Sequence, residues 1–269
     1  MVNTDLARIM TIAGSDSGGG AGIQGDIKTI TALGGFATTA ITAITAQNTL
    51  GVHNILNIPL KMIERQISCV LNDIGTDAIK IGMLSNKKII ICVANILSKI
   101  NKNIPIVLDP VMVAKGGYKL LAPGAEETLI QELMPLCNII TPNIPEAEVI
   151  TGIKINNIKD LEASGKKIIK MGISNVLMKG GHLKKNNLTD ILINKDIIDY
   201  FYSDKIITKN SHGTGCALSS AIACGLGQKM DLNTAVKRAH TFVYKSIKYA
   251  PNIGKGNGPL NHLINNIKN

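Results

Sequence analysis

Two glycine-rich segments of the chain have the composition of anion-binding loops. The first is GSDSGGGAG, from Gly14 to Gly22, and the second is SHGTGC, from Ser211 to Cys216, in front of a run of small residues. Glycines let a backbone approach a ligand closely, and the N–H groups at the start of a helix have no partner within it. Both segments predict loops that clamp a small polar or anionic ligand, although flexible turns are the simpler alternative.

Cys216 falls in the first turn of the helix that the second segment would begin. A helix N-terminus lowers the pKa of a thiol, so this position predicts a reactive cysteine. The alternative is a small buried side chain, with Gly213 and Gly215 only shaping a turn. The other four cysteines lie in apolar patterns and none forms a C-x-x-C pair, so neither a disulfide framework nor a structural zinc site is expected.

Three polar side chains follow apolar runs further along the chain. Asn143 and Glu146 stand three residues apart at the start of a helical pattern, which is the spacing of a capping box. The same two side chains would also suit an indirect hold on Mg²⁺ through water, and the residues alone leave both interpretations open. Lys179 ends an apolar run beside two glycines, where its ammonium could reach a phosphate or simply extend to solvent.

Two common nucleotide-binding signatures are missing or incomplete. The P-loop pattern G-x-x-x-x-G-K-[ST] occurs nowhere in the sequence. A G-x-G-x-x-G match begins at Gly20, but residues 33–48, where a dinucleotide fold needs an acidic residue, contain neither Asp nor Glu. We therefore exclude P-loop and Rossmann dinucleotide binding.

A parallel sheet must position these segments. Short runs rich in Ile, Val and Leu predict strands at 8–13, 37–46, 78–81, 104–108, 138–141, 175–178 and 191–193. Apolar residues at helical spacing alternate with them, at 23–33, 60–70, 89–100 and 232–243. This order predicts a doubly wound α/β fold with a mostly parallel central sheet between two helical layers, in a single domain over residues 1–269. The polar segments follow the strands, so we expect the site at the carboxyl ends of the strands.

Composition narrows the function classes. The chain has 269 residues and a net charge of +10, but its lysines are scattered among Asn and Ile and aromatic residues make up only 3%. Nucleic-acid binding is therefore disfavoured, because little is available for base stacking. No apolar stretch reaches the roughly 18–20 residues of a membrane span. Asp5 and Arg8 fall where a signal peptide would have an unbroken apolar segment, so export is not expected. The odd number of cysteines also gives no sign of a disulfide framework, so we expect a cytoplasmic location.

Several motifs together carry a family resemblance. IAGSDSGGGAGIQGDIKT, TAQNTLGV, KIGML, LDPVM, ITPNIPEAE, VLMKGGH and TKNSHGTGCALSSAIA occur in this order between about residues 8 and 260. In these motifs the chain resembles the hydroxymethylpyrimidine/phosphomethylpyrimidine kinases of thiamine biosynthesis, within the ribokinase superfamily. The resemblance implies a ribokinase-like fold and ATP-dependent phosphorylation of 4-amino-5-hydroxymethyl-2-methylpyrimidine and of its monophosphate, with Mg²⁺. It also implies a homodimer.

The resemblance also assigns roles to residues. Gln47 would hydrogen-bond the aminopyrimidine edge, because its amide is both donor and acceptor. Substrate contacts would further come from Gly14, Ala21, Met83, Val111 and Asp26. The nucleotide side would consist of Asp109, Asn143, Glu146 and Lys179, with Asp109 and Glu146 associated with magnesium. Gly213, Gly215 and Cys216 would form a catalytic anion hole. Cys216 stands where most ribokinase relatives have an Asp that acts as the catalytic base.

Three rival functions stay open at this point. A pyridoxal or pyridoxine kinase of the same superfamily would act on a ring that also carries a hydroxymethyl group. A cysteine-dependent acyl-transfer enzyme would use Cys216 as nucleophile, but no clear His–Asp partner set accompanies it. A nucleic-acid-binding module would show strongly salt-dependent binding to DNA.

Overall fold

The computed structural model describes residues 6–114, 116–181 and 187–264. Within them one sheet of nine strands has the order β3-β2-β1-β4-β5-β6-β7-β8-β9. The strands are β1 (Arg8–Asp16), β2 (Phe36–Asn48), β3 (Gly51–Asn57), β4 (Ala78–Ile81), β5 (Ile106–Leu108), β6 (Ile139–Ile140), β7 (Asn175–Met178), β8 (Asn187–Asn194) and β9 (Ile198–Asp204). The six from β2 to β7 in this order are parallel, whereas β3, β8 and β9 pair antiparallel.

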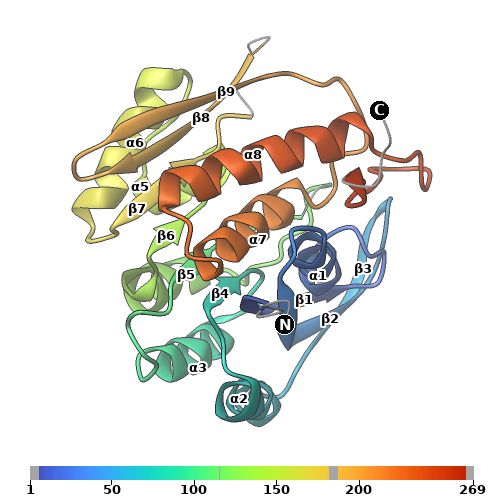
Figure 1. The fold of residues 1–269 in the computed structure, drawn as a ribbon, viewed down its shortest axis with the longest axis vertical. Coiled ribbons are helices and arrows are strands. Elements are labelled where there is room, and N and C mark those ends of the chain that lie inside the picture. Colours follow the sequence, from blue (N-terminus) through green and yellow to red (C-terminus); the bar gives the residue numbers. More distant parts are fainter. Residues whose placement is uncertain (1–5, 115, 182–186, 265–269) are drawn as a thin grey trace, which may run out of the picture.

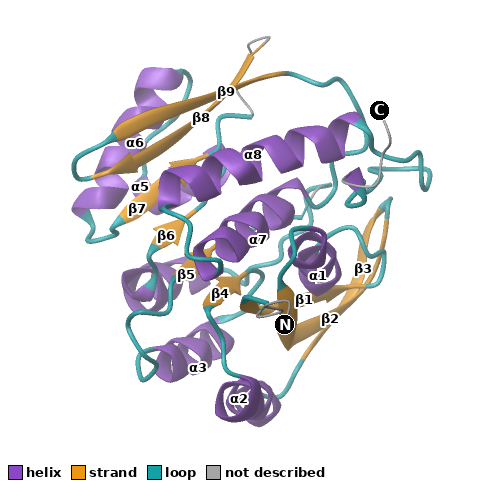
Figure 2. Cartoon of the chain, in the orientation of Figure 1, coloured by secondary structure: helices purple, strands orange, loops and turns teal. Residues whose placement is uncertain are grey.

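Helices cover both faces of the sheet (Figures 1 and 2). One layer contains α1 (Gly22–Ala32), α7 (Thr214–Gly227) and α8 (Leu232–Lys248). The opposite layer is built from α2 (Leu60–Cys69), α3 (Lys87–Leu97), α4 (Ala125–Thr128), α5 (Ile144–Thr151) and α6 (Ile158–Lys170), with short helical segments at Val70–Ile74, Leu129–Leu133 and Met134–Leu136. This is the predicted three-layer, ribokinase-like α/β architecture.

The strand pattern explains why two helical layers are needed. Within β1, Met10 and Ile12 pack into the core under α2 and α3, whereas Ile9 packs into the core under α1 and α7. Successive side chains of a strand point to opposite faces, so a strand that is apolar throughout must be covered twice. The continuous apolar runs read from the sequence are these central strands.

The outer strands differ from the sequence-based expectation. β3 and β9 were not expected, and the run at 191–193 belongs to β8, which is antiparallel rather than parallel. The physical reason is exposure: most of β3 and alternate residues of β9 face solvent, so neither has the apolar run of a covered strand. The sheet is therefore wider than its parallel part.

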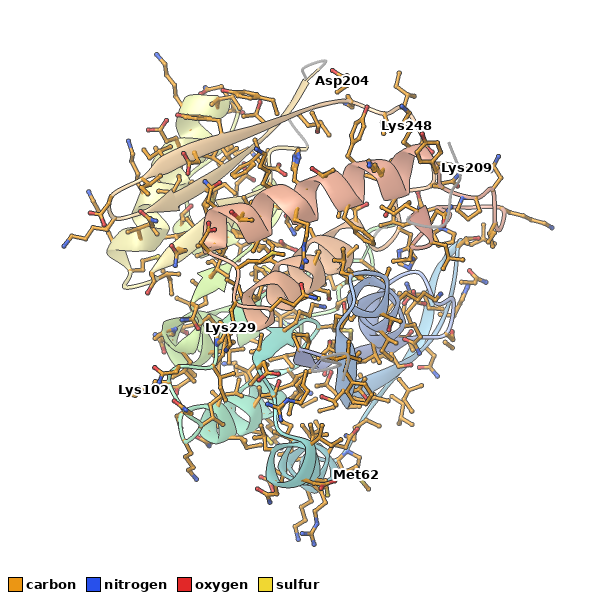
Figure 3. The ribbon with its side chains drawn as sticks, in the orientation of Figure 1. Met62, Lys102, Asp204, Lys209, Lys229 and Lys248 are labelled. Atoms are coloured by element: carbon orange, nitrogen blue, oxygen red, sulfur yellow. The ribbon has the colours of Figure 1, made fainter. Side chains whose placement is uncertain are left out.

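The surface carries its positive charge in separate places. Figure 3 shows Lys102, Lys229 and Lys248 projecting from different parts of the molecule. Among the described residues, no helix has both the length and the apolar character that crossing a bilayer requires.

Candidate active site

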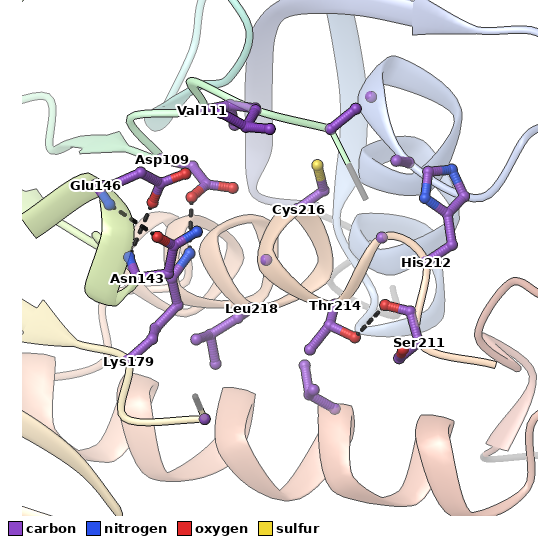
Figure 4. Close-up of a pocket in the computed structure, with 18 of the residues that line it drawn as sticks. Asp109, Val111, Asn143, Glu146, Lys179, Ser211, His212, Thr214, Cys216 and Leu218 are labelled. Atoms are coloured by element: carbon purple, nitrogen blue, oxygen red, sulfur yellow. Dashed lines mark hydrogen bonds and ion pairs between the residues drawn. The ribbon is translucent and has the colours of Figure 1, made fainter. Parts of the chain in front are cut away.

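The carboxyl ends of the parallel strands open into a cavity of about 660 Å³. Sheet order arranges the polar segments along this edge, from Gln47 on β2 through the glycine loop after β1 to Lys179 after β7. The N-terminus of α7 faces them (Figure 4). All the predicted site residues except Asp26 line this cavity: Gly14, Ala21, Gln47, Met83, Asp109, Val111, Asn143, Glu146, Lys179, Gly213, Gly215 and Cys216.

Small and apolar side chains form the end of the cavity near β1 and β2. A Cβ placed on Gly14 would lie 3.0 Å from Met83 Sδ, so a side chain at this position would press on the Met83 thioether. The pairing of β2 with β3 shifts register between Ala46 and Gln47. Such irregularities turn a side chain out of its regular direction, and Gln47 lines the cavity. This end suits a flat ring that carries polar edges.

An ion pair lies at the opposite end of the cavity. Lys179 Nζ is 3.0 Å from Asp109 Oδ1, and both side chains are largely buried. Burial alone would lower the pKa of Lys179, but the carboxylates of Asp109 and Glu146 outweigh it and raise that pKa. A Cβ on Gly215 would lie 3.2 Å from Lys179 Nζ and 3.3 Å from Asp109 Oδ2, so the first turn of α7 packs directly on this pair.

Asn143 and Glu146 form the capping box that their spacing predicted. Asn143 Oδ1 accepts from the Glu146 N–H at 3.0 Å, and Glu146 Oε2 accepts from the Asn143 N–H at 2.8 Å. Burial raises the pKa of Glu146 to about 7, although Lys179 opposes the shift. The structural role of the pair is thus established, while its association with magnesium stays a prediction.

The carboxylates at this end of the cavity suit a metal ion that enters the site already bound to phosphates and water. Among the described residues, no three His, Cys, Asp or Glu side chains are grouped closely enough to hold a metal ion by themselves. Asp109 and Glu146 supply one carboxylate each. Mg²⁺ keeps several waters and is commonly bound by one or two carboxylates together with substrate phosphates. The residues present therefore fit magnesium carried by a nucleotide rather than a resident metal centre.

The start of α7 has the features of an anion hole. Gly213 caps the helix with φ 87°, and a Cβ there would collide with the carbonyl oxygen of Gly20. The Ala217 N–H bonds the Gly213 carbonyl, but within the described part of the chain the N–H groups of Gly215 and Cys216 have no acceptor. These two N–H groups and the helix dipole together attract negative charge.

The thiol of Cys216 departs from the expectation of a lowered pKa. Burial raises the pKa of Cys216 to about 11, even though Lys80 and an N–H group of Gly22 both stabilise the thiolate. Removal from water therefore outweighs the helix N-terminus. At neutral pH the side chain is a thiol, which corrects the interpretation of Cys216 as a ready thiolate.

Asp26 lies behind the cavity rather than in it. Its side chain is completely buried on α1, and both carboxylate oxygens are 2.8 Å from Lys80 Nζ. The hydroxyls of Thr11 and Ser220 also donate to it. Asp26 therefore joins β1, β4, α1 and α7, and the structure corrects its placement as a substrate contact.

Three further residues of the cavity wall were not identified from the sequence. Lys80 interrupts the apolar run of β4, and a lysine within a strand that is buried on both faces could have indicated from the sequence that this residue has a special role. Asp16 and His212 lie inside the two glycine-rich motifs, and His212 Nε2 is 2.8 Å from Asp16 Oδ2. Nothing in the spacing of these two residues indicates that contact. His182, at the end of VLMKGGH, lies outside the described residues.

Comparison with known proteins decides the family. The model of the phosphomethylpyrimidine kinase family matches residues 16–261. The chain belongs to this family. It is 46% identical over 263 residues to the hydroxymethylpyrimidine/phosphomethylpyrimidine kinase of Haemophilus influenzae, covering 96% of this chain and 97% of that one. It is also 43% identical over 256 residues to a bifunctional thiamine-biosynthesis protein of Geobacter sulfurreducens, covering 95% of this chain but only 52% of that protein, so it spans about half of that relative.

Solved structures of this kinase family and of pyridoxal kinases share the fold. The phosphomethylpyrimidine kinase of Clostridium difficile is 45% identical, with a TM-score of 0.80 over 90% of this chain and 99% of that one. The pyridoxal kinase of Staphylococcus aureus in complex with AMP-PCP and pyridoxal is 32% identical, with a TM-score of 0.89 over 97% of this chain and 95% of that one. Sequence identity is thus higher to the pyrimidine kinase, whereas backbone similarity is higher to the pyridoxal kinase.

Proposed function

We propose that this kinase transfers the γ-phosphoryl group of ATP to the hydroxymethyl oxygen of 4-amino-5-hydroxymethyl-2-methylpyrimidine, and then phosphorylates the resulting monophosphate for thiamine biosynthesis. The observation that carries the proposal is the order of groups along the cavity. Gln47 lies at one end, the N-terminus of α7 in the middle and the Asp109–Lys179 pair at the other end. That order suits a ring, a transferring phosphoryl group and a nucleotide in line.

The acceptor end supplies positioning. The amide of Gln47 can donate to and accept from the aminopyrimidine edge, while Gly14, Met83 and Val111 enclose the ring. A fixed ring places the hydroxymethyl oxygen toward Cys216 and the start of α7. Phosphoryl transfer depends mainly on such in-line positioning and on exclusion of water.

Charge neutralisation comes from the middle and the far end of the cavity. The N–H groups of Gly215 and Cys216, which have no acceptor in the described part of the chain, would face the transferring group, and Lys179 is near enough to contact phosphate oxygens. Magnesium bound with the nucleotide near Asp109 and Glu146 would add positive charge there. Only the thiolate form of Cys216 could take the proton of the acceptor hydroxyl as transfer proceeds, and with a pKa of about 11 that form is a small fraction at neutral pH.

Pyridoxal is a second candidate substrate, favoured by the backbone similarity to the S. aureus pyridoxal kinase. We propose it only as a side activity, because sequence identity to the pyrimidine kinases is higher. The test is a coupled ATP-consumption assay with the hydroxymethylpyrimidine, its monophosphate and pyridoxal supplied separately. We expect kcat/KM to be highest for the two pyrimidines. A higher value for pyridoxal would reverse the assignment.

Three further expectations remain proposals. Residues 1–269 are proposed to act as one kinase domain, and a cytoplasmic location is expected for a thiamine-biosynthesis kinase. A homodimer is also proposed, supported by Ile44 and Leu56, which pair across β2 and β3 and are 46% and 66% exposed. Light scattering on the purified chain would give its mass in solution, and a monomer at micromolar concentration would contradict the dimer.

A further inference from the structure

The imidazole of His212 lies between two polar side chains at the acceptor end of the cavity. Its Nε2 atom is 2.8 Å from Asp16 Oδ2 and 3.3 Å from the amide nitrogen of Gln47. The ring also packs on Gly20, because a Cβ there would lie 2.5 Å from His212 Cδ2. Figure 4 shows His212 on the loop that leads into α7. The ring is thus held by contacts with two other segments.

Counting protons shows which atom donates. Asp16 has a carboxylate that already accepts three backbone N–H groups of the glycine loop. These donors and His212 outweigh burial and hold the pKa of Asp16 below its ordinary value. A carboxylate only accepts, so the contact with His212 requires a proton on Nε2. If the Gln47 atom nearest to this Nε2–H group were the amide nitrogen, two hydrogen-bond donors would face each other with no acceptor between them.

The hydroxyl of Thr45 removes this conflict. It donates its single proton to the Ser15 carbonyl at 2.8 Å, and its oxygen lies 3.2 Å from the Gln47 amide oxygen. Amide oxygen and nitrogen are assigned from the surrounding network. If the Gln47 amide is turned by a half rotation, its nitrogen donates to Thr45 and its oxygen accepts from His212. Every donor in the cluster then faces an acceptor.

We infer that His212 is a positioning residue that fixes the orientation of the Gln47 amide, and with it the hydrogen-bond pattern offered to the substrate. In this orientation Gln47 keeps one N–H and one oxygen lone pair for a ligand. A 4-aminopyrimidine edge presents a ring nitrogen that accepts beside an amino group that donates, which is the complementary pair. The inference rests on the proposed function, since it concerns how this substrate is recognised.

The test compares two acceptors, the hydroxymethylpyrimidine and the analogue that lacks the 4-amino group. The quantity measured is the ratio of their kcat/KM values. We expect H212A to reduce this ratio about tenfold, the effect of one ordered hydrogen bond. H212Q should keep the ratio within about twofold, because an amide N–H can replace the Nε2–H toward Asp16. G20A should behave like H212A, because its methyl group displaces the ring.

A merely structural role for His212 predicts a different result. Disturbance of the loop would lower kcat/KM for both acceptors equally and leave the ratio unchanged, which would overturn the inference. In a Q47A background, H212A should have no further effect on the ratio, and a persistent effect would also overturn it. If the wild-type enzyme phosphorylates neither pyrimidine, the proposed function itself fails. A wild type that discriminates together with variants that discriminate equally rejects only the role of His212.

Discussion

Replacing Asp26 with alanine should destabilise the fold far more than it weakens substrate binding. The substitution leaves Lys80 without its partner, and Lys80 has no exposed surface. Burial alone would lower the pKa of Lys80, but the carboxylates of Asp26 and, less strongly, Asp109 oppose burial, and that pKa is raised. The variant must therefore bury an uncompensated ammonium, or deprotonate it, and the hydroxyls of Thr11 and Ser220 also lose an acceptor.

The expected loss is large for one residue. Removing one partner of a buried ion pair costs about 3–5 kcal/mol. For a chain of this size each kcal/mol corresponds to about 2–4 °C, so the melting temperature should fall by about 10 °C. Guanidinium unfolding followed by circular dichroism measures the free energy, and KM for the pyrimidine is measured well below the new melting temperature. We expect that KM to stay near the wild-type value.

Two comparisons make the reasoning refutable. The double variant D26L/K80M removes both charges, so it should recover much of the stability that D26A loses. Lys154, whose side chain is 76% exposed in its pair with Glu148, serves as the matched surface control, and K154A should unfold like the wild type. The reasoning is refuted if D26A loses less than about 1 kcal/mol, or if its main effect is on KM for the pyrimidine.

Three other changes give further expected outcomes. Q47A should raise KM for the pyrimidine by about one to two decades, because a buried edge loses its partner, while KM for ATP stays constant; equal losses for both would indicate misfolding. C216S should fold, keep both KM values and lose about 100-fold in kcat. The kcat of the wild type should still rise toward pH 9, because the pKa of Cys216 is about 11, and a plateau of kcat near pH 7 would contradict this. Burial lowers the pKa of His262 to about 4, below its unfolded value, so acidification from pH 7 should cost the wild type about 2–3 kcal/mol of unfolding free energy relative to H262Q. Urea unfolding of both proteins from pH 4 to 7 measures this, and a constant difference in unfolding free energy between them would disprove the effect.

The fold could be predicted where burial leaves a continuous trace in the sequence. The parallel strands β1, β4, β5, β6 and β7 bury apolar residues on both faces, so their runs are visible without a structure. The antiparallel strands β3 and β9 are partly exposed, so they lack a continuous apolar run and a search for such runs does not detect them. Sheet order is set by packing between distant segments, so the sequence alone could not place Gln47 and Lys179 at opposite ends of one cavity.

The site shows the same division between local and distant effects. The capping box of Asn143 and Glu146 depends on four consecutive residues, and it formed as the spacing predicted. The pairing of Asp26 with Lys80 joins α1 to β4, and the contact of Asp16 with His212 joins residues 196 positions apart. Motif spacing carries no information on such contacts. Asp26 was therefore placed with the substrate although its charge is already matched within the core.

Cys216 shows why position on a helix does not decide the chemistry of a side chain. The N-terminus of α7 and Lys80 favour a thiolate, but desolvation is the larger effect and the pKa rises to about 11. The same helix end acts differently on its own backbone, because Gly215 and Cys216 line the cavity and their N–H groups have no acceptor among the described residues. Lys80 and Lys179 are each matched by a carboxylate, Asp26 and Asp109 respectively. We therefore expect the attraction for a transferring phosphoryl group to come first from these backbone donors, which cost little to expose and need no change in protonation.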